Sequence, residues 1–574
     1  MAQQPHDAVA RDLAELVLAG EVDRDGLEDA KNRLCAEHGA SRVPKNSDVL
    51  DAVPDDRREE AESVLRTTPV RTASGVTPVA VMTSPAPCPH GKCTFCPGGP
   101  DSDYGSPMSY TGEEPAAMRG EHNDHDPFDQ VTQRLRDLRE TGHVVDKVEL
   151  ILMGGTMSAR SHDYQAWFVK RCLQAMNRFD PDASPDEAPG RHPGRPEAGD
   201  PEHAADGGTA AADAVADDTV SPEVLAADWT PWAAVESRNE TAGVRNIGTT
   251  FETKPDWCGP EQVDRMLALG GTKVEVGVQT LDDETLRRTH RGHDLDDVRA
   301  ANRRLHDAGF KVGFHLMPGM PGRTPEDDVA DLHGIFDDPA YRPDFLKIYP
   351  TLVVRGTGLY DRWRRGSFTP LDNAEAADVV ARGKRRIPPY CRLSRVQRDI
   401  PATEVVAGVW RSNLRQLARD RLDELGGSCD CIRCREVGHR DGAPDDLALD
   451  VVAYDCAGGE ERFIQLHDPS NDLLVGFCRL RYPGEVVRDE LEDAAIVREL
   501  HVYGDEAAVS DRSDAASDET HQHRGHGERL FRRAERLASE AGYGRLAVIS
   551  GIGVREYYRG LGCERDGPYM VEAL

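Results

Sequence analysis

The chain has 574 residues and a formal net charge of −32, from 102 Asp and Glu against 70 Lys and Arg. Its first residues, MAQQPHDAVARDL, lack the basic and apolar segments of a secretory signal, and no apolar run approaches the roughly 20 residues that a membrane span needs. We therefore expect a cytoplasmic protein of several domains with no membrane partner. Thirteen cysteines in so long a chain exclude a disulfide scaffold and favour metal binding or catalysis.

The acidic residues are spread along the whole chain, and most of the basic residues are Arg. This pattern resembles that of proteins that work in molar salt, where carboxylates hold hydration and screening shortens the range of self-repulsion. An ordinary acidic protein from a low-salt organism is the alternative. The net charge therefore describes the solvent more than the partner, and it does not exclude a nucleic acid.

Residues 1–70 show helical periodicity, with apolar positions at three- and four-residue steps in DAVARDLAELVLAG. From about residue 76, short β-branched runs alternate with longer helical stretches. Such alternation predicts βαβ units and a parallel sheet, and six repeats favour an α/β partial barrel with functional groups at the C-terminal ends of its strands. The six predicted strands are 77–84, 147–156, 244–253, 273–280, 311–319 and 344–350.

The acidic segment at 181–230 is rich in Pro, Ala and Gly, which predicts a disordered insertion. We interpret this insertion as a surface loop that the fold tolerates. The end of the chain alternates strands with one helix that starts at glycines, which predicts an α+β module. The sequence therefore divides into a helical N-terminal region at 1–70, a barrel at 71–400, a cysteine-bearing linker at 401–445 and the module at 446–574.

Three cysteines, Cys88, Cys93 and Cys96, fall within nine residues after the first predicted strand. An iron–sulfur cubane usually takes four thiolates, so three leave one iron open to another ligand. Zinc instead prefers four N or S ligands in a closed tetrahedron, and His90 lies within the loop to serve as the fourth. Both metals stay open on the residues alone.

The strings CPHGKCTFC and LILMGGTMS together resemble the radical S-adenosylmethionine (SAM) enzymes, in which three cysteines hold a [4Fe–4S] cluster and SAM binds its fourth iron. The cysteine spacing here is four residues then two, whereas three then two is usual in that superfamily. The resemblance implies that Gly154, Gly155 and Thr156 hold the amino group of SAM. It also implies that Glu252 and Gln279, at later strand ends, line the SAM pocket.

A helix predicted at 522–541 opens with QHRGHG, and its first-turn N–H groups form an anion site suited to a pyrophosphate. The pattern resembles the acyl-CoA loop of the GCN5-related N-acetyltransferase fold, whose preceding strand splays and pairs with pantetheine. A plain glycine turn with two core tyrosines is the alternative. The residues that the resemblance assigns to acetyl-CoA are Glu499, Leu500, His501, Val502, Gly525, His526 and Gly527, with Tyr557 and Tyr558 at the sulfur.

A second cysteine group lies in the linker, where Cys429, Cys431 and Cys434 precede His439. Three soft ligands beside an imidazole suit a structural zinc, with His439 as the candidate fourth ligand. Unligated cysteines in a reducing cytosol are the alternative. A metal at this position would fix the angle between the barrel and the module.

Longer strings, among them SYTGEEPAAMR, FETKPDWC, HLMPGMPG and ISGIGVREYYRGLG, are similar to the catalytic subunit of the Elongator complex in its archaeal stand-alone form. The similarity runs from about residue 65 to the end, outside the acidic segments at 181–230 and around 505–520. It implies synthesis of 5-carboxymethyluridine at the wobble position of tRNA from acetyl-CoA, with Lys147 in contact with acetyl-CoA. It also implies that the anticodon stem-loop presents a flipped, unstacked base.

The chemistry that this family implies explains why both modules are needed. A 5′-deoxyadenosyl radical abstracts a hydrogen from the acetyl methyl group, and the resulting carbon radical adds to uracil C5. Loss of an electron and a proton restores the ring, and hydrolysis of the thioester leaves the carboxymethyl group.

The densest basic run, at 382–399, is assigned to tRNA phosphates, together with Arg-rich positions near 411–421 and the N-terminal helices. A solvated basic face is the alternative. Two other functions compete: a protein lysine acetyltransferase with a structural iron–sulfur domain, and a tRNA-binding scaffold without activity. The sequence does not identify the reductant, and it leaves open a homodimer.

Overall fold

The computed structural model describes residues 5–574 apart from 24–25, 39–43, 45, 51, 55–56, 66–74, 181–229, 441–443 and 504–524. The predicted acidic insertion at 181–230, except for its last residue, and the acidic segment at 505–520 lie outside the described residues. Among the residues that are described, no helix combines the length and the apolar character that a membrane crossing requires.

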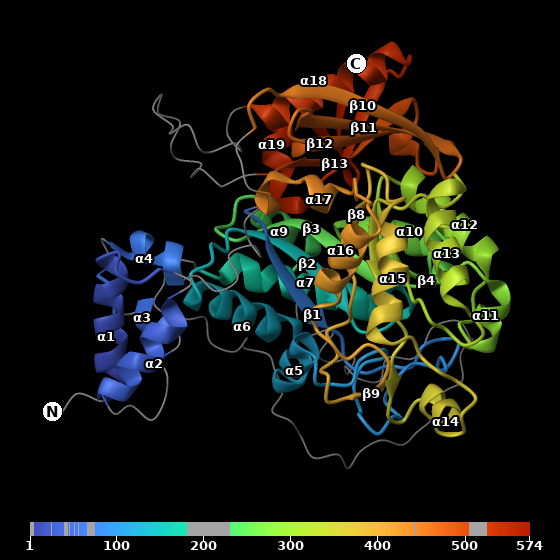
Figure 1. Ribbon diagram of the computed structural model, residues 1–574. Helices are drawn as coiled ribbons and strands as arrows, with labels where there is room; N and C mark the ends of the chain where they lie inside the picture. Colours follow the sequence, from blue (N-terminus) through green and yellow to red (C-terminus); the bar gives the residue numbers. More distant parts are fainter. Residues whose placement is uncertain are drawn as a thin grey trace, which may run out of the picture.

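Four helices of the described residues form a separate N-terminal unit (Figure 1), with its own small apolar core that includes Val9, Leu13, Val49 and Leu65. This arrangement follows the predicted helical periodicity of 1–70. The helices are α1 (Pro5–Leu18), α2 (Leu27–His38), α3 (Asn46–Leu50) and α4 (Arg58–Leu65).

Within the described residues, a seven-stranded parallel sheet forms the centre of the molecule, in the order β1-β2-β3-β4-β5-β6-β8 (Figure 1). Since β1 and β8 are both edge strands, the sheet is an open partial barrel, and the predicted α/β partial barrel is confirmed. The strands are β1 (Thr77–Met82), β2 (Lys147–Met153), β3 (Arg245–Thr253), β4 (Gly271–Gln279), β5 (Lys311–Leu316), β6 (Phe345–Ile348) and β8 (Arg392–Arg395).

The sequence analysis did not predict the seventh strand, β8. It lies inside the basic run 382–399 and pairs in parallel with β6. Its sequence, RLSR, contains a single apolar residue, Leu393, which is fully buried. The flanking arginines hide the strand pattern, because a period-two signal needs more than one apolar position.

Helices cover the outer side of the barrel strands and seal them from solvent (Figure 1). Capping boxes at Asp294, Thr324 and Asp372 fix where three of them begin. Each of these side chains accepts a hydrogen bond from the N3 backbone N–H, and the N3 carboxylate accepts one from the backbone N–H of the cap residue. The helices are α5 (Pro115–His122), α6 (Pro127–Glu140), α7 (His162–Arg178), α9 (Trp232–Asn239), α10 (Pro260–Ala268), α11 (Asp283–Arg288), α12 (Leu295–Asp307), α13 (Pro325–Asp337), α15 (Asn373–Lys384) and α16 (Leu414–Glu424). A further helix, α14 (Gly358–Arg364), packs instead on the short strand β7 (Val353–Val354).

A second sheet builds the C-terminal unit, in the order β10-β11-β12-β13-β14-β16-β15. Its strands are antiparallel except for the β13–β14 pair. The helix α18 (His526–Glu540) packs its apolar face on this sheet through Leu530, Phe531, Ala534 and Ala538. The other elements are β10 (Ala448–Cys456), β11 (Gly459–Asp468), β12 (Leu473–Tyr482), β13 (Ala494–Val502), β14 (Arg545–Ile549), β15 (Glu564–Asp566), β16 (Tyr569–Ala573) and α19 (Arg555–Gly560).

Short elements complete the chain. A two-stranded antiparallel sheet pairs β7 with β9, and the helix α17 lies in the linker between the barrel and the C-terminal unit. The bounds are β7 (Val353–Val354), β9 (Val405–Ala407), α17 (Ile432–Arg435), η3 (Met157–Ala159), η5 (Pro255–Trp257), η6 (Val437–His439), η7 (Asp489–Leu491) and η8 (Ile552–Val554).

Buried ion pairs join the barrel to the C-terminal unit. Arg498 on β13 donates to both oxygens of Asp344, at 2.7 and 2.8 Å, and both side chains are fully buried. Arg479 on β12 approaches the same carboxylate at 3.3 Å, and Arg481 pairs with Asp307 at 2.6 Å. Each charge is matched, as a buried charge must be.

These contacts place the C-terminal unit at the N-terminal ends of the barrel strands. Asp344 directly precedes β6, and Phe310, whose carbonyl accepts from Arg498, directly precedes β5. Gly551 approaches the start of β3 so closely that a Cβ there would collide with the carbonyl of Ile247. The opposite end of the barrel, where the strands finish, carries the first cysteine group.

Candidate active site

A cavity of about 2080 Å³ runs through the barrel from one end to the other. At one end it is lined by Cys88, Cys93 and Cys96, and at the other by Gly525 and Tyr557 of the C-terminal unit. Among the described residues, fourteen Lys or Arg side chains line it against nine Asp or Glu. The cavity is therefore richer in basic groups than a chain of net charge −32 would lead one to expect, which favours anionic ligands.

The three cysteines sit in a pocket of N–H donors. The backbone N–H of Ser109 donates to the sulfur of Cys96 at 3.2 Å, and the guanidinium of Arg291 donates to that of Cys93 at 3.4 Å. Burial raises the pKa of the Cys96 thiol to about 11. Donors aimed at sulfur and three thiols on one cavity fit an iron–sulfur cluster.

The glycine pair after β2 lies directly against these cysteines, as the sequence predicts. Gly154 and Gly155 adopt φ of 124° and 95°, which favour glycine. A Cβ at Gly154 would collide with the hydroxyl of Thr83, and one at Gly155 would lie 3.8 Å from the sulfur of Cys88. The hydroxyl of Thr156 lies 3.5 Å from the same sulfur. The backbone here is shaped for close approach of a ligand.

Gln279 and Glu252 lie at the ends of β4 and β3, on the same side of the barrel as the cysteines. Gln279 has φ of 75°, which is strained for a residue with a side chain, and its buried Oε1 has no hydrogen-bond partner among the described residues. Glu252 accepts a hydrogen bond from Tyr110 at 3.3 Å. The orphaned amide oxygen indicates a place where a ligand donor is missing.

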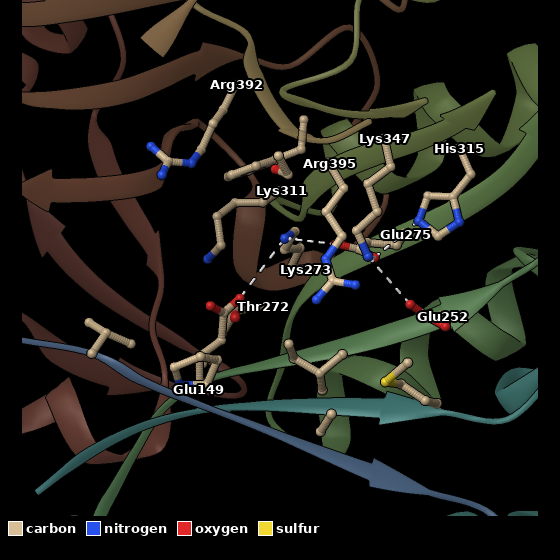
Figure 2. Close-up of a pocket in the computed structure, with 18 of the residues that line it drawn as sticks. Glu149, Glu252, Thr272, Lys273, Glu275, Lys311, His315, Lys347, Arg392 and Arg395 are labelled. Atoms are coloured by element: carbon tan, nitrogen blue, oxygen red, sulfur yellow. Dashed lines mark hydrogen bonds and ion pairs between the residues drawn. The ribbon is translucent and has the colours of Figure 1, made fainter. Parts of the chain in front are cut away.

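Figure 2 shows a network of charged side chains in the middle of the cavity. Lys273 pairs with Glu275 at 2.9 Å, and Lys347 contacts both Glu275 and Glu252. His315 lies 3.1 Å from Glu275. Burial alone would raise the pKa of Glu275, but the two lysines hold it well below its ordinary value.

Three members of this network have the composition of a metal site. Ligand atoms of Glu252, Glu275 and His315 lie within 4.8 Å of one another. The ammonium group of Lys347, however, contacts both carboxylates and fills the place that a cation would take. The network is therefore balanced by lysine rather than by metal.

Sequence reasoning missed this network, and the reason is visible on β4. Lys273, Glu275 and Gln279 alternate with buried valines, a pattern that normally indicates a strand with one solvated face. In this fold that face lines an internal cavity.

Two lysines at the start of barrel strands face the C-terminal unit. Lys311 opens β5 and points into the cavity in Figure 2, and within the described part of the chain it makes no hydrogen bond or ion pair. Lys147, which the sequence assigns to acetyl-CoA, opens β2 and lies 3.9 Å from Asp146. Burial lowers the pKa of both lysines.

The far end of the cavity lies where two strands of the C-terminal unit diverge. Pairing between β13 and β14 stops at Val497 and Val548, whereas β13 stays paired with β12 as far as Val502. Pairing with β14 therefore ends before residues 499–501, which, together with Val502, are the stretch that the resemblance assigns to pantetheine. The gap opens beside Gly525, which caps α18 with φ of 75°.

The structure gives the two predicted tyrosines different surroundings. A Cβ at Gly527 would lie 2.6 Å from the hydroxyl of Tyr557, so this phenol sits over the first turn of α18. Burial raises the pKa of Tyr557 to about 12, which keeps it a proton donor at neutral pH. Tyr558 is buried and packs on Phe531 with ring centroids 6.0 Å apart. His526 begins α18 and is also buried.

The second cysteine group is compact. The sulfurs of Cys429, Cys431 and Cys434 lie within 4.8 Å of one another, a spacing suited to one metal ion. No fourth His, Cys, Asp or Glu of the described residues joins this group. His439, the candidate fourth ligand, instead pairs with Glu436 at 2.9 Å.

The basic run 382–399 is partly internal. Arg392 pairs with Glu436, and Arg395 pairs with Asp399. Arg398 donates to the backbone carbonyl of Ser109, in the segment between the cysteines and α5. These arginines line the cavity and are engaged in these contacts, which leaves fewer free charges in this run than its sequence suggests.

Comparisons with known proteins were made on this background. Three family models match: the ELP3 N-terminal domain at residues 6–73, the Radical SAM superfamily at 220–333 and the Radical SAM C-terminal domain at 343–424. A tRNA uridine(34) acetyltransferase of Methanocaldococcus infernus is 43% identical over 540 residues, which cover 92% of each chain. Elongator complex protein 3 of Homo sapiens is 38% identical over 576 residues, covering 98% of this chain and 96% of that protein.

A solved structure is also similar. The archaeal Methanocaldococcus infernus Elp3 with an N-terminal deletion matches with a TM-score of 0.69 and 38% sequence identity. The match covers 87% of this chain and 100% of that one.

Proposed function

The chain belongs to the Elongator complex protein 3 family, and from this premise we propose that it modifies the wobble uridine of tRNA at uracil C5, with acetyl-CoA as the carbon donor and 5-carboxymethyluridine as the product. The observation that supports this most is the cavity, because it connects the cysteine loop to the splayed strands of the C-terminal unit through the barrel. A reaction that begins at one site and ends on a ligand of the other needs such a connection.

At the cysteine end, Cys88, Cys93 and Cys96 would hold a [4Fe–4S] cluster, and SAM would bind beside it. When bound, this pair supplies a 5′-deoxyadenosyl radical, which is reactive enough to take a hydrogen from an acetyl methyl group. Gly154, Gly155 and Thr156 offer backbone groups to the amino group of SAM. The orphaned Oε1 of Gln279 accepts a further donor of SAM, and Glu252 adds a carboxylate to the same pocket.

At the other end, residues 446–574 form a GCN5-related N-acetyltransferase domain that holds acetyl-CoA. The edge of β13 at 499–501, beyond its pairing with β14, binds pantetheine, and the first turn of α18 at 525–527 binds the pyrophosphate. Tyr557 lies beside that turn, where its phenol can donate a proton to the leaving thiolate. Lys147 and Lys311 enter the cavity from the barrel and face the thioester.

Between the two ends, the tRNA base enters the cavity. Its basic lining favours the phosphates that accompany a flipped nucleotide, and the network around Glu275 keeps the charges inside the barrel balanced. Exposed arginines of 382–399 and 411–421, with the N-terminal helices, are proposed to contact the rest of the anticodon stem-loop.

The experiment that tests this function is mass spectrometry of wobble nucleosides. The cluster-loaded protein is incubated without oxygen with SAM, acetyl-CoA, dithionite and an unmodified tRNA. We expect 5-carboxymethyluridine that depends on both SAM and acetyl-CoA. Cluster-loaded protein that binds tRNA but leaves uridine unchanged would contradict the proposal.

We also propose that Cys429, Cys431 and Cys434 hold one structural zinc ion in the linker. Metal analysis of the purified protein should find one zinc per chain. The Cys431→Ala variant should lose the zinc and unfold at a lower temperature, because the metal binds the folded state. Cys563→Ala, a change at a buried cysteine directly before β15, should keep the zinc. Equal zinc contents in the Cys431→Ala variant and the parent would exclude this assignment.

A further inference from the structure

The loop between Cys88 and Cys93 carries a histidine whose two ring nitrogens both have partners. The Nε2 atom of His90 lies 3.1 Å from the sulfur of Cys93, and its Nδ1 atom lies 2.9 Å from the Nζ of Lys254. The family comparisons assign no role to this side chain, and the sequence offers it only as the fourth ligand of the alternative zinc site. Its position against a proposed cluster ligand calls for a physical account.

The partner on Nδ1 determines which nitrogen of His90 carries the proton. Lys254 is in an ion pair with Asp256 at 3.2 Å, and an ammonium group has donors only. Nδ1 must therefore accept, which leaves the proton of the neutral ring on Nε2. The N–H on Nε2 then donates to the sulfur of Cys93.

The surroundings of His90 hold the ring in this orientation. Lys254 directly follows β3 and its side chain is only 5% exposed, so it is a fixed partner. Gly292 lies on the other side, with φ of 75°, and a Cβ there would come within 2.5 Å of the Cβ of His90. The ring thus occupies a space that a glycine leaves open and a buried lysine orients.

We propose that His90 is a positioning residue that donates a permanent hydrogen bond to the Cys93 thiolate and thereby raises the reduction potential of the cluster, with Lys254 as the residue that fixes its tautomer. The inference rests on the proposed function, because it assumes that Cys93 is a cluster ligand. A donor on a ligating sulfur stabilises the extra negative charge that reduction adds. Easier reduction favours delivery of the electron that cleaves SAM.

The same geometry argues against His90 as a metal ligand. A ligating Nε2 would need a free lone pair, and the proton would then have to sit on Nδ1, against the ammonium group of Lys254. The alternative of a zinc site at Cys88, Cys93 and Cys96 with His90 as fourth ligand is disfavoured on this ground.

The test is an EPR-monitored redox titration of the full-length, cluster-loaded protein, with iron and sulfide per chain matched between variants. His90→Ala removes the donor, whereas His90→Gln places an amide N–H near the position of Nε2. Lys254→Met frees the tautomer. Lys92→Met is the control for lost charge, because Lys92 is exposed in the same loop and donates only to the carbonyl of Pro97 among the described residues.

We expect the midpoint potential of His90→Ala to fall by about 59 mV. For a one-electron couple, this shift changes the oxidised-to-reduced ratio about tenfold. The midpoint potential of Lys254→Met should also fall, and by more than that of Lys92→Met. The midpoint potential of His90→Gln should stay near that of the parent.

Three results would overturn the inference. The potential of His90→Ala could equal that of the parent or of Lys92→Met, or His90→Gln could fall as far as His90→Ala. Alternatively, both His90 variants could fail to bind iron where Lys92→Met succeeds, which would make His90 a ligand. A parent protein that binds no cluster would instead refute the proposed function, so the two failures are distinguishable.

Discussion

Cys93→Ala protein, incubated without oxygen with SAM, acetyl-CoA, dithionite and tRNA, is expected to form no detectable 5-carboxymethyluridine and no 5′-deoxyadenosine above background. Cys93 is the buried thiol at which both His90 and Arg291 aim their N–H groups. Its loss removes one of three proposed cluster ligands from a site with no spare cysteine in the loop. Liquid chromatography with mass spectrometry measures both products in one reaction.

Cys172→Ala is the matched control, because Cys172 is a fully buried cysteine on α7 that does not line the cavity. It should retain the cluster and the activity. The comparison also decides between the proposed function and a protein lysine acetyltransferase with a structural iron–sulfur domain. Such an enzyme would transfer acetyl groups equally well with Cys93→Ala, whereas wild-type uridine modification by that variant would refute the radical mechanism.

Arg498→Met is expected to destabilise the junction between the barrel and the C-terminal unit by about 3–5 kcal/mol, because it leaves Asp344 buried with one of its two arginine partners missing. Urea unfolding followed by circular dichroism measures the change. Arg536→Met on the exposed face of α18 is the control, since Arg536 has no ion pair or hydrogen bond among the described residues. The control should change stability by less than about 0.5 kcal/mol.

A double variant distinguishes the cost of an unpaired buried charge from the cost of lost packing. Removing both partners in Arg498→Met with Asp344→Leu should recover part of the loss, because no unpaired carboxylate is then buried.

Burial would raise the pKa of Asp344, but Arg498 and Arg479 hold it below its ordinary value. Its ion pair therefore stabilises the fold above the ordinary carboxyl pKa of about 3.9 and is lost as the pH falls further. Equal stability of Arg498→Met and Arg536→Met would contradict the junction as described.

The barrel was predictable because its strands carry the strongest local signal in the chain. Two β-branched runs end before Thr83 and before Gly154. The first is followed by the cysteine segment and the second by a glycine pair, and a regular strand needs neither. Parallel strands finish at the same end of a sheet, so adjacent strand ends predict a shared site. The structure places Gly155 against Cys88 on this principle. The strand β8 escaped prediction since its arginines outnumber its single buried leucine.

The interior of the cavity was not predictable from periodicity. Lys273, Glu275 and Lys347 occupy strand positions that sequence rules assign to a solvated face, and only the curvature of the sheet turns that face inward. The same holds for Arg479 and Arg498, which each follow an apolar or small residue on β12 and β13 and are buried because the barrel covers them. Long-range assembly decides these environments, and a local pattern does not encode it.

The most direct test of the connection between the two ends of the cavity uses acetyl-CoA deuterated on its acetyl methyl group. We expect one deuterium in the 5′-deoxyadenosine and two in the carboxymethyl group of the modified uridine, because the hydrogen is taken from the acetyl carbon that joins uracil. Deuterium-free 5′-deoxyadenosine formed alongside labelled carboxymethyluridine would show that the acetyl group is activated by another route, and the proposed link between the cysteine loop and the acyl-donor site would then be wrong.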